Sequence, residues 1–526
     1  MATQTKSVFL YGKPTTVKRN ELIIMQEMYT KLINSFIEKL VSDKKYWLDI
    51  LNNNKKAPQI RELEKANRTK LGSAFGQNAI DHAVKELHNH FIRIRNDLYG
   101  KTIGSDKNYF VASIALLNAC IQDFSVNDTE ILIKNFIDNT KKDDVDKLAF
   151  YNEILDILKK HSEDEIQDMM LDVKILFLEE LESRNIPTLK KAPLQLDSRL
   201  CTLGKATNIK ADYVLSVKTL ERGKRIEIPL STSKNSIRRL NQYGMQSPTI
   251  TVTEKGIMVA VPFKKKVKNK SSNKNLKGID IGITDLIYSS DGLAYGNYSK
   301  VTNFYNAKVL PEDRKNNQLR SLMKKYQKEL RDKNTHPKRK EFLRKKICNI
   351  NTMLQQNKKA NRIRQSYKHL QNTEISKAAS DYFLSIEGTN ATTVMEDLDI
   401  ITFDRGKESN RRNSMWARGQ LHKKIESLLL WNGYKVIKVD PAYTSKLCPV
   451  CNNIHNDNRH GKDFTCTCCG YTADADYNAS INIKNRAFDK EVSLIVEEYR
   501  YNTKKRHTAL KELYEKRNKE YKTTVV

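Results

Sequence analysis

Residues 276–297, LKGIDIGITDLIYSSDGLAYGN, decide the fold of the C-terminal half of this chain. The stretch predicts an apolar strand, a second strand, an SSDG turn and a third strand. Asp280 lies inside the first strand, and the isoleucines on either side of it point the other way, into a core, because side chains alternate along a strand. A carboxylate on a buried strand is costly unless a cation or hydrogen-bond donors compensate it. Gly278 and Gly282 thin the strand, which lets a backbone or a ligand approach.

A second apolar strand, TTVMED, carries Glu396 near its end. Alternation places Val394 and Glu396 on one face of this strand. Asp397 and Asp399 follow closely, so the sequence leaves open which of these acids points inward. An acid in a loop or at a helix cap would produce the same local pattern.

Asp474 and Asp476 lie in ADADYNAS, just before a predicted helix. The helix dipole favours acids at that position, so each acid taken alone has an ordinary structural explanation. Acids at the ends of three neighbouring elements of a strongly basic protein instead indicate phosphodiester hydrolysis by two-metal chemistry. That chemistry needs clustered carboxylates to hold two divalent cations about 4 Å apart. Hard oxygen ligands favour Mg²⁺ or Mn²⁺.

The cysteines of the chain are unevenly distributed. Of eight cysteines, five crowd between positions 448 and 469. CPVC and CTCCG form two knuckles separated by a short polar loop, and thiolates with this spacing are typical of a tetrahedral Zn²⁺ site. The predicted ligands are Cys448, Cys451, Cys466 and Cys469, while Cys468 is a spare or reactive thiol, and His455 and His460 in the loop are alternative ligands.

The charge of the chain indicates a polyanionic partner. Its 526 residues carry 93 Lys and Arg against 62 Asp and Glu, a formal net charge of +31. Nucleic acid is the commonest such partner, although solvated Lys-rich helices of a basic enzyme are the alternative explanation. No run of about 18 apolar residues is present, and the start, MATQTKSVFLYGKP, lacks the apolar core of a signal peptide. We therefore expect the protein to stay in the cytosol.

The N-terminal half changes from strand to helices and back to strands. SVFLYGK at 6–12 predicts a strand, and NELIIMQEMYTKLINSFIEKLV predicts an amphipathic helix. RIEIPLS and SPTITVTEKGIMVAVPFKK then alternate apolar and polar residues, and the EKG turn indicates a β-hairpin. This order predicts a small β-barrel with a helical insertion. Further helices are expected at 75–100, 108–120, 127–137, 145–160 and 163–184.

The C-terminal half continues with helical and strand-forming segments. The basic, Ser/Asn-rich run KKKVKNKSSNKNLK, at 264–277, is typical of a linker. Residues 311–385 predict a long, charged, mostly helical segment that is interrupted near NTHPKR. A helix at 416–432 and the strand YKVIKVD follow, and a charged helical tail ends the chain.

The order of GIDIGITDL, VMEDL, GYKVIKVDPAYTSKLCPVC and FTCTCCGYTADADYNASINI resembles the superfamily of TnpB and miniature type V CRISPR nucleases. The resemblance covers about 276–485, roughly two-fifths of the chain. Members carry three RuvC acids in this order, with a zinc ribbon before the third that belongs to a lobe which helps to load or position DNA. The resemblance makes Asp280 the first acid and Glu396 the second. The D-x-N-A pattern makes Asp476, ahead of Asp474, the third.

The resemblance also implies the domain layout, which the N-terminal half matches in order only. The implied fold is multidomain α+β: an oligonucleotide-binding-like β-barrel with a helical recognition-lobe insertion, then an RNase H-like α/β RuvC domain with an inserted zinc ribbon. The expected domains are the β-barrel at 1–20 and 195–265, the recognition lobe at 21–194, a basic linker at 266–277, the RuvC-like domain with its helical tail at 278–443 and 472–526, and the zinc ribbon at 444–471.

The sequence therefore predicts an RNA-guided DNA endonuclease that cuts phosphodiester bonds by two-metal-ion hydrolysis, after guide pairing and recognition of a short flanking motif. We expect two Mg²⁺ or Mn²⁺ ions, one structural Zn²⁺, a guide RNA and a target DNA. The protein is expected as a monomer or homodimer on one guide RNA, in the prokaryotic cytosol and on the nucleoid when DNA is bound. The alternatives are a guided repressor that does not cut, a zinc-ribbon nucleic-acid-binding protein whose acids are structural, and a guide-free RNase H-like resolvase. CRISPR and transposon contexts both remain open, and the long N-terminal half favours a compact CRISPR effector.

Overall fold

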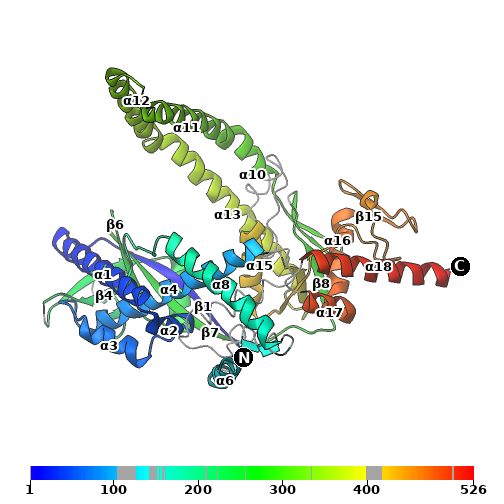
Figure 1. The fold of residues 1–526 in the computed structure, drawn as a ribbon, viewed down its shortest axis with the longest axis horizontal. Coiled ribbons are helices and arrows are strands. Elements are labelled where there is room, and N and C mark those ends of the chain that lie inside the picture. Colours follow the sequence, from blue (N-terminus) through cyan, green and yellow to red (C-terminus); the bar gives the residue numbers. More distant parts are fainter. Residues whose placement is uncertain are drawn as a thin grey trace. The chain divides into compact units, whose positions relative to one another are not determined.

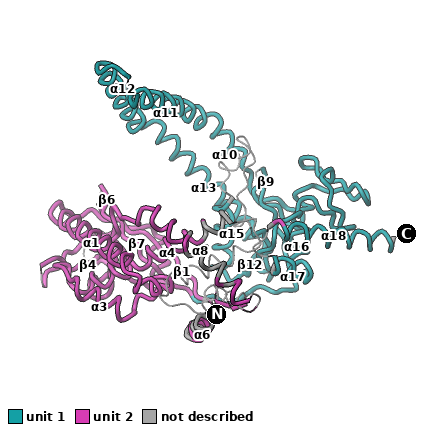
Figure 2. The backbone as a smooth tube through the Cα atoms, viewed as in Figure 1, with its two compact units in different colours: residues 1–2, 266–500, 505–526 teal, residues 3–265, 501–504 magenta. Residues whose placement is uncertain are grey.

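A computed structural model places most of the chain in two compact units (Figure 2). One unit comprises residues 1–2, 266–500 and 505–526, and the other comprises 3–265 and 501–504. Within the described part of the chain, none of the helices combines the length and apolar character that crossing a membrane demands. The structure describes residues 2–102, 126–140, 148, 151–152, 155–156, 159, 162–207, 210–221, 223–254, 256–282, 284–332, 334–397, 418–499 and 503–525.

The unit of residues 3–265 contains a seven-stranded sheet in the order β2-β6-β7-β1-β5-β4-β3. Strand β1 (Ala2–Gly12) lies between strands that come much later in the sequence. Strands β6 (Thr249–Thr253) and β7 (Gly256–Val267) pair antiparallel, which confirms the hairpin predicted at EKG. The remaining strands are β2 (Leu194–Gln195), β3 (Cys201–Lys205), β4 (Tyr213–Lys218) and β5 (Arg225–Ser231).

Helices occupy the sequence between β1 and β2. Helix α1 (Thr16–Ser42) packs against α4 (Ser73–Thr102) through apolar residues that recur every three or four positions, as the amphipathic pattern predicts. Buried Gln26 of α1 donates a 2.7 Å hydrogen bond to the carbonyl of Ala192, just before β2. The other helices of this unit are η1 (Lys44–Tyr46), α2 (Trp47–Leu51), α3 (Pro58–Ala66), α6 (Val126–Asn139), α8 (Glu163–Ser183) and α9 (Lys234–Tyr243).

Helices α4, α6 and α8 confirm the helices predicted at 75–100, 127–137 and 163–184. Helix α8 begins with a reciprocal capping box between Ser162 and Glu165, which satisfies two backbone donors at its N-terminus. The predicted helix at 108–120 lies outside the described residues, and most of the one at 145–160 does too.

The unit of residues 266–500 is built on a five-stranded mixed sheet in the order β10-β9-β8-β11-β12. The three strands β8, β11 and β12 are parallel, whereas β9 runs antiparallel to β8 and β10 antiparallel to β9. The predicted strands of 276–297, TTVMED and YKVIKVD are therefore confirmed. Their bounds are β8 (Leu276–Asp280), β9 (Asp285–Ser289), β10 (Ala294–Asn297), β11 (Thr392–Glu396) and β12 (Val436–Val439).

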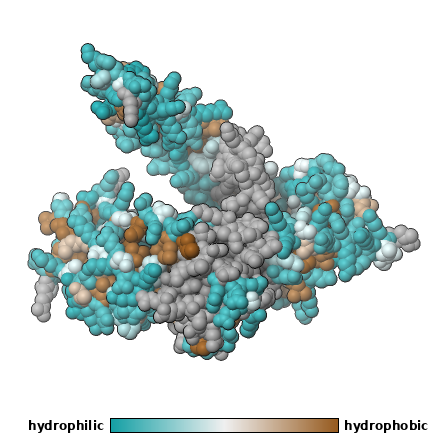
Figure 3. Space-filling view, viewed as in Figure 1, coloured by the Kyte–Doolittle hydropathy of each residue, from teal (hydrophilic) through white to brown (hydrophobic). Residues whose placement is uncertain are grey.

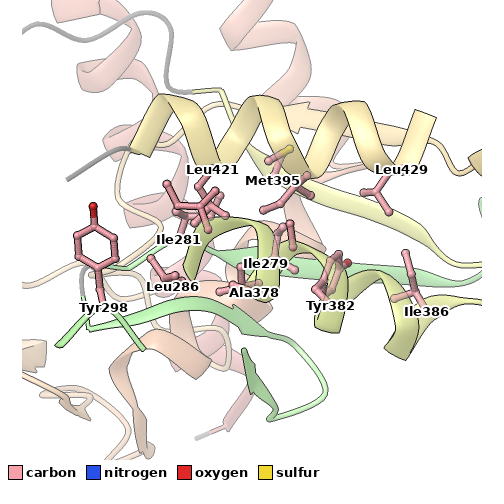
Figure 4. Close-up of a cluster of buried hydrophobic side chains, with 14 of the residues drawn as sticks. Ile279, Ile281, Leu286, Tyr298, Ala378, Tyr382, Ile386, Met395, Leu421 and Leu429 are labelled. Atoms are coloured by element: carbon pink, nitrogen blue, oxygen red, sulfur yellow. The ribbon is translucent and has the colours of Figure 1, made fainter. Parts of the chain in front are cut away.

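Helices cover both faces of this sheet. On one face, Ile279 and Met395 pack in an apolar core with α13 (Lys358–Ile386) and α15 (Arg418–Asn432), as Figure 4 shows. On the other face, Val394 packs with Ile483 of α16 (Ala475–Arg486). Residues of β8 and β11 therefore alternate between two cores, with Ile279 and Met395 in one and Leu276 and Val394 in the other.

Helices α11 (Leu310–Arg331), α12 (Pro337–Gln355) and the start of α13 form a helical arm, residues 310–370, that projects from this sheet (Figure 1). The break between α11 and α12 confirms the interruption predicted near NTHPKR. The visible face of the arm is hydrophilic in the space-filling view (Figure 3). Helix α10 (Ser299–Phe304) and the π-helical turn η2 (Tyr305–Val309) connect β10 to the arm.

A small three-stranded sheet and two helices complete the unit. The sheet, ordered β13-β14-β15, spans the second half of the cysteine-rich segment and leads into α16. The predicted charged helical tail is confirmed by α17 and α18. The bounds are η3 (Asn456–Asn458), β13 (Arg459–His460), β14 (Asp463–Thr465), β15 (Thr472–Asp474), α17 (Lys490–Glu498) and α18 (Thr503–Val525).

Candidate active site and metal centre

Two of the predicted acids end adjacent parallel strands. Met395 of β11 is paired with Ile279 of β8, so the next residues, Glu396 and Asp280, lie side by side at the carboxyl ends of these strands. Both follow an apolar residue that faces the α13 side, so alternation turns both carboxylates toward α16. Ligand sites of open α/β sheets are expected at this edge.

Helix α16 brings the third acid to the same edge. It packs closely on β8, because a Cβ added to Gly278 would overlap the backbone carbonyl of Ser480. Glycine at this position therefore admits a helix backbone, as the sequence suggested. Asp476, in the first turn of α16, is buried. Asp474 is the N-cap of the same helix, and its Oδ1 accepts hydrogen bonds from the backbone N–H groups of Asp476 (2.8 Å) and Tyr477 (3.0 Å).

Two of the carboxylates act electrostatically on the third. Burial, then the charges of Glu396 and Asp476, raise the pKa of Asp280 to about 8. The carboxylates are nevertheless less tightly grouped than the cysteines: within the described residues, only four cysteines bring ligand atoms within 4.8 Å of one another.

Thr444 holds one of these acids and was not predicted from the sequence. Its hydroxyl donates a 2.6 Å hydrogen bond to Oε1 of Glu396. The backbone around Thr444 is fixed by α16, since buried Asn482 donates to the carbonyls of Thr444 (2.9 Å) and Leu447 (2.7 Å). Tyr443, just before it, has a φ of 65°. That left-handed conformation is uncommon for a bulky residue and is a form of strain that gathers at functional sites.

Arg459, on β13, is a second residue that sequence reasoning missed. Its guanidinium forms a 2.8 Å ion pair with Asp476. The three-stranded sheet brings Arg459 close to Asp476. In this sheet, Phe464 of β14 pairs with Arg459 of β13 on one side and with Ala473 of β15 on the other. One sequence feature could have indicated the position of Arg459: the GK turn at 461–462 is followed by alternating apolar and polar residues, which is typical of a hairpin.

The C-terminal helix stabilises the turn that carries Thr444. Arg506 of α18 forms a 2.9 Å ion pair with Asp440, and both side chains are almost fully buried, at 1% and 2% exposure. Arg486 of α16 donates hydrogen bonds to the carbonyls of Asp440 (2.6 Å) and Ala442 (2.7 Å). The turn at 440–444 is thus held by buried charged groups from two helices.

The four predicted zinc ligands converge. The Sγ atoms of Cys448 and Cys469 are 3.6 Å apart, and those of Cys451 and Cys466 are 3.5 Å apart. A tetrahedron with Zn–S bonds of about 2.3 Å has sulfur–sulfur edges of about 3.8 Å, so the four thiols fit one zinc ion. His455 and His460 are exposed and do not belong to this group.

The electrostatics of the cysteine cluster also fit a cation. Burial raises the pKa of Cys448 to about 12 and raises that of Cys451 as well. Burial also acts on Cys466, but backbone N–H groups of Cys469 and Cys468 outweigh it and lower the pKa to about 7. Buried thiolates of this kind need a compensating metal. Cys468 lies outside the cluster, where its Sγ accepts a 3.7 Å hydrogen bond from Asn518 of α18.

The segment that carries these features matches a known family. Residues 419–483 match the model described as "Cas12f1-like, TNB domain". The chain is 41% identical over 111 residues to the CRISPR-associated endodeoxyribonuclease Cas12f1 of Sulfoacidibacillus thermotolerans, covering 21% of this chain and 25% of that protein. It is 26% identical over 225 residues to InsQ of Escherichia coli strain K12, provisionally named an RNA-guided DNA endonuclease, covering 40% of this chain and 48% of that one.

A third relative is the TnpB-like protein aq_aa05 of Aquifex aeolicus, 34% identical over 83 residues that cover 15% of this chain and 26% of that protein. The chain thus spans between a quarter and a half of the length of these curated relatives. The matches confirm the resemblance seen in the sequence motifs. Together they show that parts of the chain are similar to TnpB-like proteins and to the miniature type V CRISPR nuclease Cas12f1.

Proposed function

We propose that the chain is an RNA-guided DNA endonuclease whose residues 278–443 and 472–526 form an RNase H-like RuvC domain. The observation that carries this proposal is the meeting of Asp280, Glu396 and Asp476 at one edge of the β10-β9-β8-β11-β12 sheet. The mixed sheet, with β9 antiparallel to β8, and the names of the relatives support it.

The residues at this edge have distinct roles in the proposal. Asp280, Glu396 and Asp476 would hold two Mg²⁺ or Mn²⁺ ions, which supply an activated water and stabilise the leaving oxygen. Thr444 orients the Glu396 carboxylate through its hydrogen bond. The planar guanidinium of Arg459 lies at the same edge and is suited to pair with a DNA phosphate.

The other parts of the chain serve the guide and target in this proposal. The sheet of 1–20 and 195–265 acts as an oligonucleotide-binding-like barrel, and the helices of 21–194 act as the recognition lobe. The strand–helices–strands order of that unit supports both roles. Residues 266–277 link the barrel to the nuclease, although their first two residues belong to β7 and their last two to β8. Residues 444–471 form a ribbon held by one Zn²⁺ on Cys448, Cys451, Cys466 and Cys469.

The test begins with purification of the full chain and sequencing of any RNA that copurifies. That RNA, or a guide built on it, is then combined with a target flanked by randomised sequence and with Mg²⁺. The expected result is cleavage that requires the RNA, a matching target, a short flanking motif and a divalent ion, and that Asp280→Asn abolishes while guided binding persists.

Each alternative predicts a different result in the same assay. RNA-independent, sequence-specific cleavage would identify a guide-free resolvase. RNA-dependent target binding without cleavage by the wild-type chain would identify a guided repressor. Binding to nucleic acid without target specificity would leave a zinc-ribbon nucleic-acid-binding protein whose acids are structural.

A further inference from the structure

An aromatic residue, Tyr288, stands beside the first of the three acids. It lies on β9, where it pairs directly with Asp280 of β8. Residues that oppose each other on neighbouring antiparallel strands project from the same face of a sheet, with Cβ atoms about 5 Å apart. The carboxylate of Asp280 projects toward α16, so the ring of Tyr288 does as well. The ring therefore adjoins a carboxylate to which the proposed function assigns a metal.

The electrostatic surroundings of the Tyr288 hydroxyl agree with this placement. Burial, then the charges of Asp474, Asp285 and Asp476, raise the pKa of the hydroxyl. The ammonium of Lys462, in the turn between β13 and β14, acts in the opposite direction. The hydroxyl is therefore neutral at physiological pH, and it adds no negative charge that would repel a phosphate.

Tyr288 does not belong to either apolar core of this sheet. The five strands contain one other aromatic residue, Tyr295 of β10, whose ring packs edge-on against Tyr382 of α13 with 5.6 Å between centroids. Tyr288 is part neither of that core nor of the core of Val394 and Ile483 on the opposite face. Among the described residues, no other aromatic ring stacks on it. Packing alone therefore does not explain a large aromatic side chain among these acids.

One side of the Tyr288 ring is open. Strand β10 is the edge of the sheet, and its residue that pairs with Tyr288 is Ala294. Ala294 is exposed and carries only a methyl group, so the residue that opposes Tyr288 on β10 does not cover the ring. Tyr288 itself is partly exposed. The ring thus lies between the carboxylate of Asp280 and an uncovered sheet edge, where a flat ligand can reach it.

The flat ligand that this position fits is an unpaired nucleic-acid base. Partly exposed aromatic rings on sheet surfaces stack single bases in several nucleic-acid-binding domains. The neighbouring carboxylates, once they hold cations, attract a phosphate. A base on the ring would then belong to a nucleotide next to that phosphate. A base inside a duplex is already stacked and paired, and it reaches such a ring only after it leaves the helix.

We propose that Tyr288 is a positioning residue whose ring stacks with an unpaired base of the DNA strand, next to the phosphate that is cut. The inference rests on the proposed function, because a guided nuclease separates the strands of its target and so supplies unpaired bases. The stack holds the strand in register with the carboxylates. It depends on the ring and not on the hydroxyl, and it favours a single strand over a duplex without reading sequence.

The first test needs neither a guide nor cleavage. The full chain, freed of nucleic acid at high salt, is mixed with a single-stranded DNA that contains iodouracil, and Ca²⁺ is added to neutralise the carboxylates. This base forms photo-crosslinks with aromatic rings on which it stacks, and mass spectrometry identifies the crosslinked residue. We expect a crosslink at Tyr288 that persists in Tyr288→Phe. A duplex of the same sequence should give a yield at least about fivefold lower.

The second test measures single-turnover cleavage with guide, target and Mg²⁺. Tyr288→Leu removes the ring and should slow cleavage about 5–100-fold, the range expected for loss of one base–aromatic stack. Tyr288→Phe should cut at close to the wild-type rate. The Mg²⁺ concentration for half-maximal cleavage should stay unchanged in both variants, because the ring holds no metal. A distorted Asp280 would raise that concentration, so this readout separates stacking from a structural effect.

Tyr499→Leu is the matched control for Tyr288→Leu. Tyr499 is a partly exposed tyrosine of the same unit that follows α17, and its replacement should leave both the crosslink and cleavage unchanged. Thermal melts check that every variant folds.

Three results would overturn the inference. Absence of a crosslink at Tyr288 in the wild-type chain would show that no base stacks there. Equal slowing by the Phe and Leu variants would assign the effect to the hydroxyl. A raised Mg²⁺ requirement in Tyr288→Leu would show that the ring only supports Asp280. A crosslink at Tyr288 in a chain that shows no guided cleavage would retain the single-strand site and reject the nuclease proposal instead.

Discussion

Thr444 and Glu396 are joined by a 2.6 Å hydrogen bond from the threonine hydroxyl to Oε1 of the carboxylate, although they lie 48 residues apart. The bond links the end of β11 to the turn that follows β12. Buried Arg486 and Arg506 hold that turn from α16 and α18. The position of the second acid therefore depends on the C-terminal helices as well as on the sheet.

Thr444→Val keeps the shape of this side chain and removes its donor. In the proposed nuclease, a partner that orients a metal-binding carboxylate is worth about 10–100-fold in metal affinity. We expect half-maximal cleavage to require Mg²⁺ higher by a factor in that range, with a small change in melting temperature. Thr444→Ser keeps the hydroxyl and should restore the wild-type Mg²⁺ dependence. Identical behaviour of the Val and Ser variants would show that the hydrogen bond has no such role.

Gly278→Ala tests the close approach of α16 to β8. The added Cβ would overlap the carbonyl of Ser480 and lie 2.7 Å from the backbone nitrogen of Lys484, and neither atom moves without shifting the helix. Overpacking of this kind typically costs about 1–3 kcal/mol. The free energy of unfolding should fall by that amount in denaturant titration. Gly204→Ala, in strand β3 with open space around its would-be Cβ, is the matched control and should be nearly neutral.

Each part of the fold that the sequence predicted is specified by residues that lie close together in the chain. Strands β8 and β11 are short strands that end in acids, and the cysteine knuckles have a spacing that few other structures require. Thr444 has no comparable local signal, and Arg459 has only the GK turn of its hairpin, because the roles of both residues depend on contacts between distant segments. Arg459 reaches Asp476 through the register of β13, β14 and β15, in which Asp463 pairs with Asp474. A shift of that register by one residue would turn its side chain to the opposite face.

The cysteine cluster should hold one zinc ion per chain. Cys448→Ser and Cys469→Ser should each lose the metal, as measured by elemental analysis after dialysis, and should lower the melting temperature. Replacing either thiol leaves the three remaining cysteines without a complete tetrahedral set of zinc ligands. Cys468→Ser should retain zinc, because Cys468 lies outside the cluster and contacts Asn518. Loss of zinc from Cys468→Ser alone would mean that the ligand set is misassigned.

Substitutions of Asp474 and Asp476 test the catalytic proposal against each other. The two acids lie two residues apart, but Asp474 caps a helix whereas Asp476 is a proposed metal ligand. Asp474 caps α16 through two backbone N–H groups, so Asp474→Ala should cost about 1 kcal/mol of stability and leave cleavage largely intact. The charge of Asp476 acts on Asp280, so Asp476→Asn relieves repulsion between these two carboxylates. It also weakens the ion pair with Arg459, and these opposing effects should leave the melting temperature nearly unchanged.

Cleavage by Asp476→Asn should nevertheless collapse, since two-metal hydrolysis fails when a carboxylate ligand is lost. Asp280→Asn and Glu396→Gln should behave in the same way, with guided binding retained in all three variants. The measurements are cleavage with guide, target and Mg²⁺, beside thermal melts of each variant. If Asp474→Ala is inactive and Asp476→Asn cuts normally, the third acid is misassigned but the mechanism stands. If every variant cuts at the wild-type rate, the acids at this edge of the sheet are structural, and the nuclease proposal for this unit is wrong.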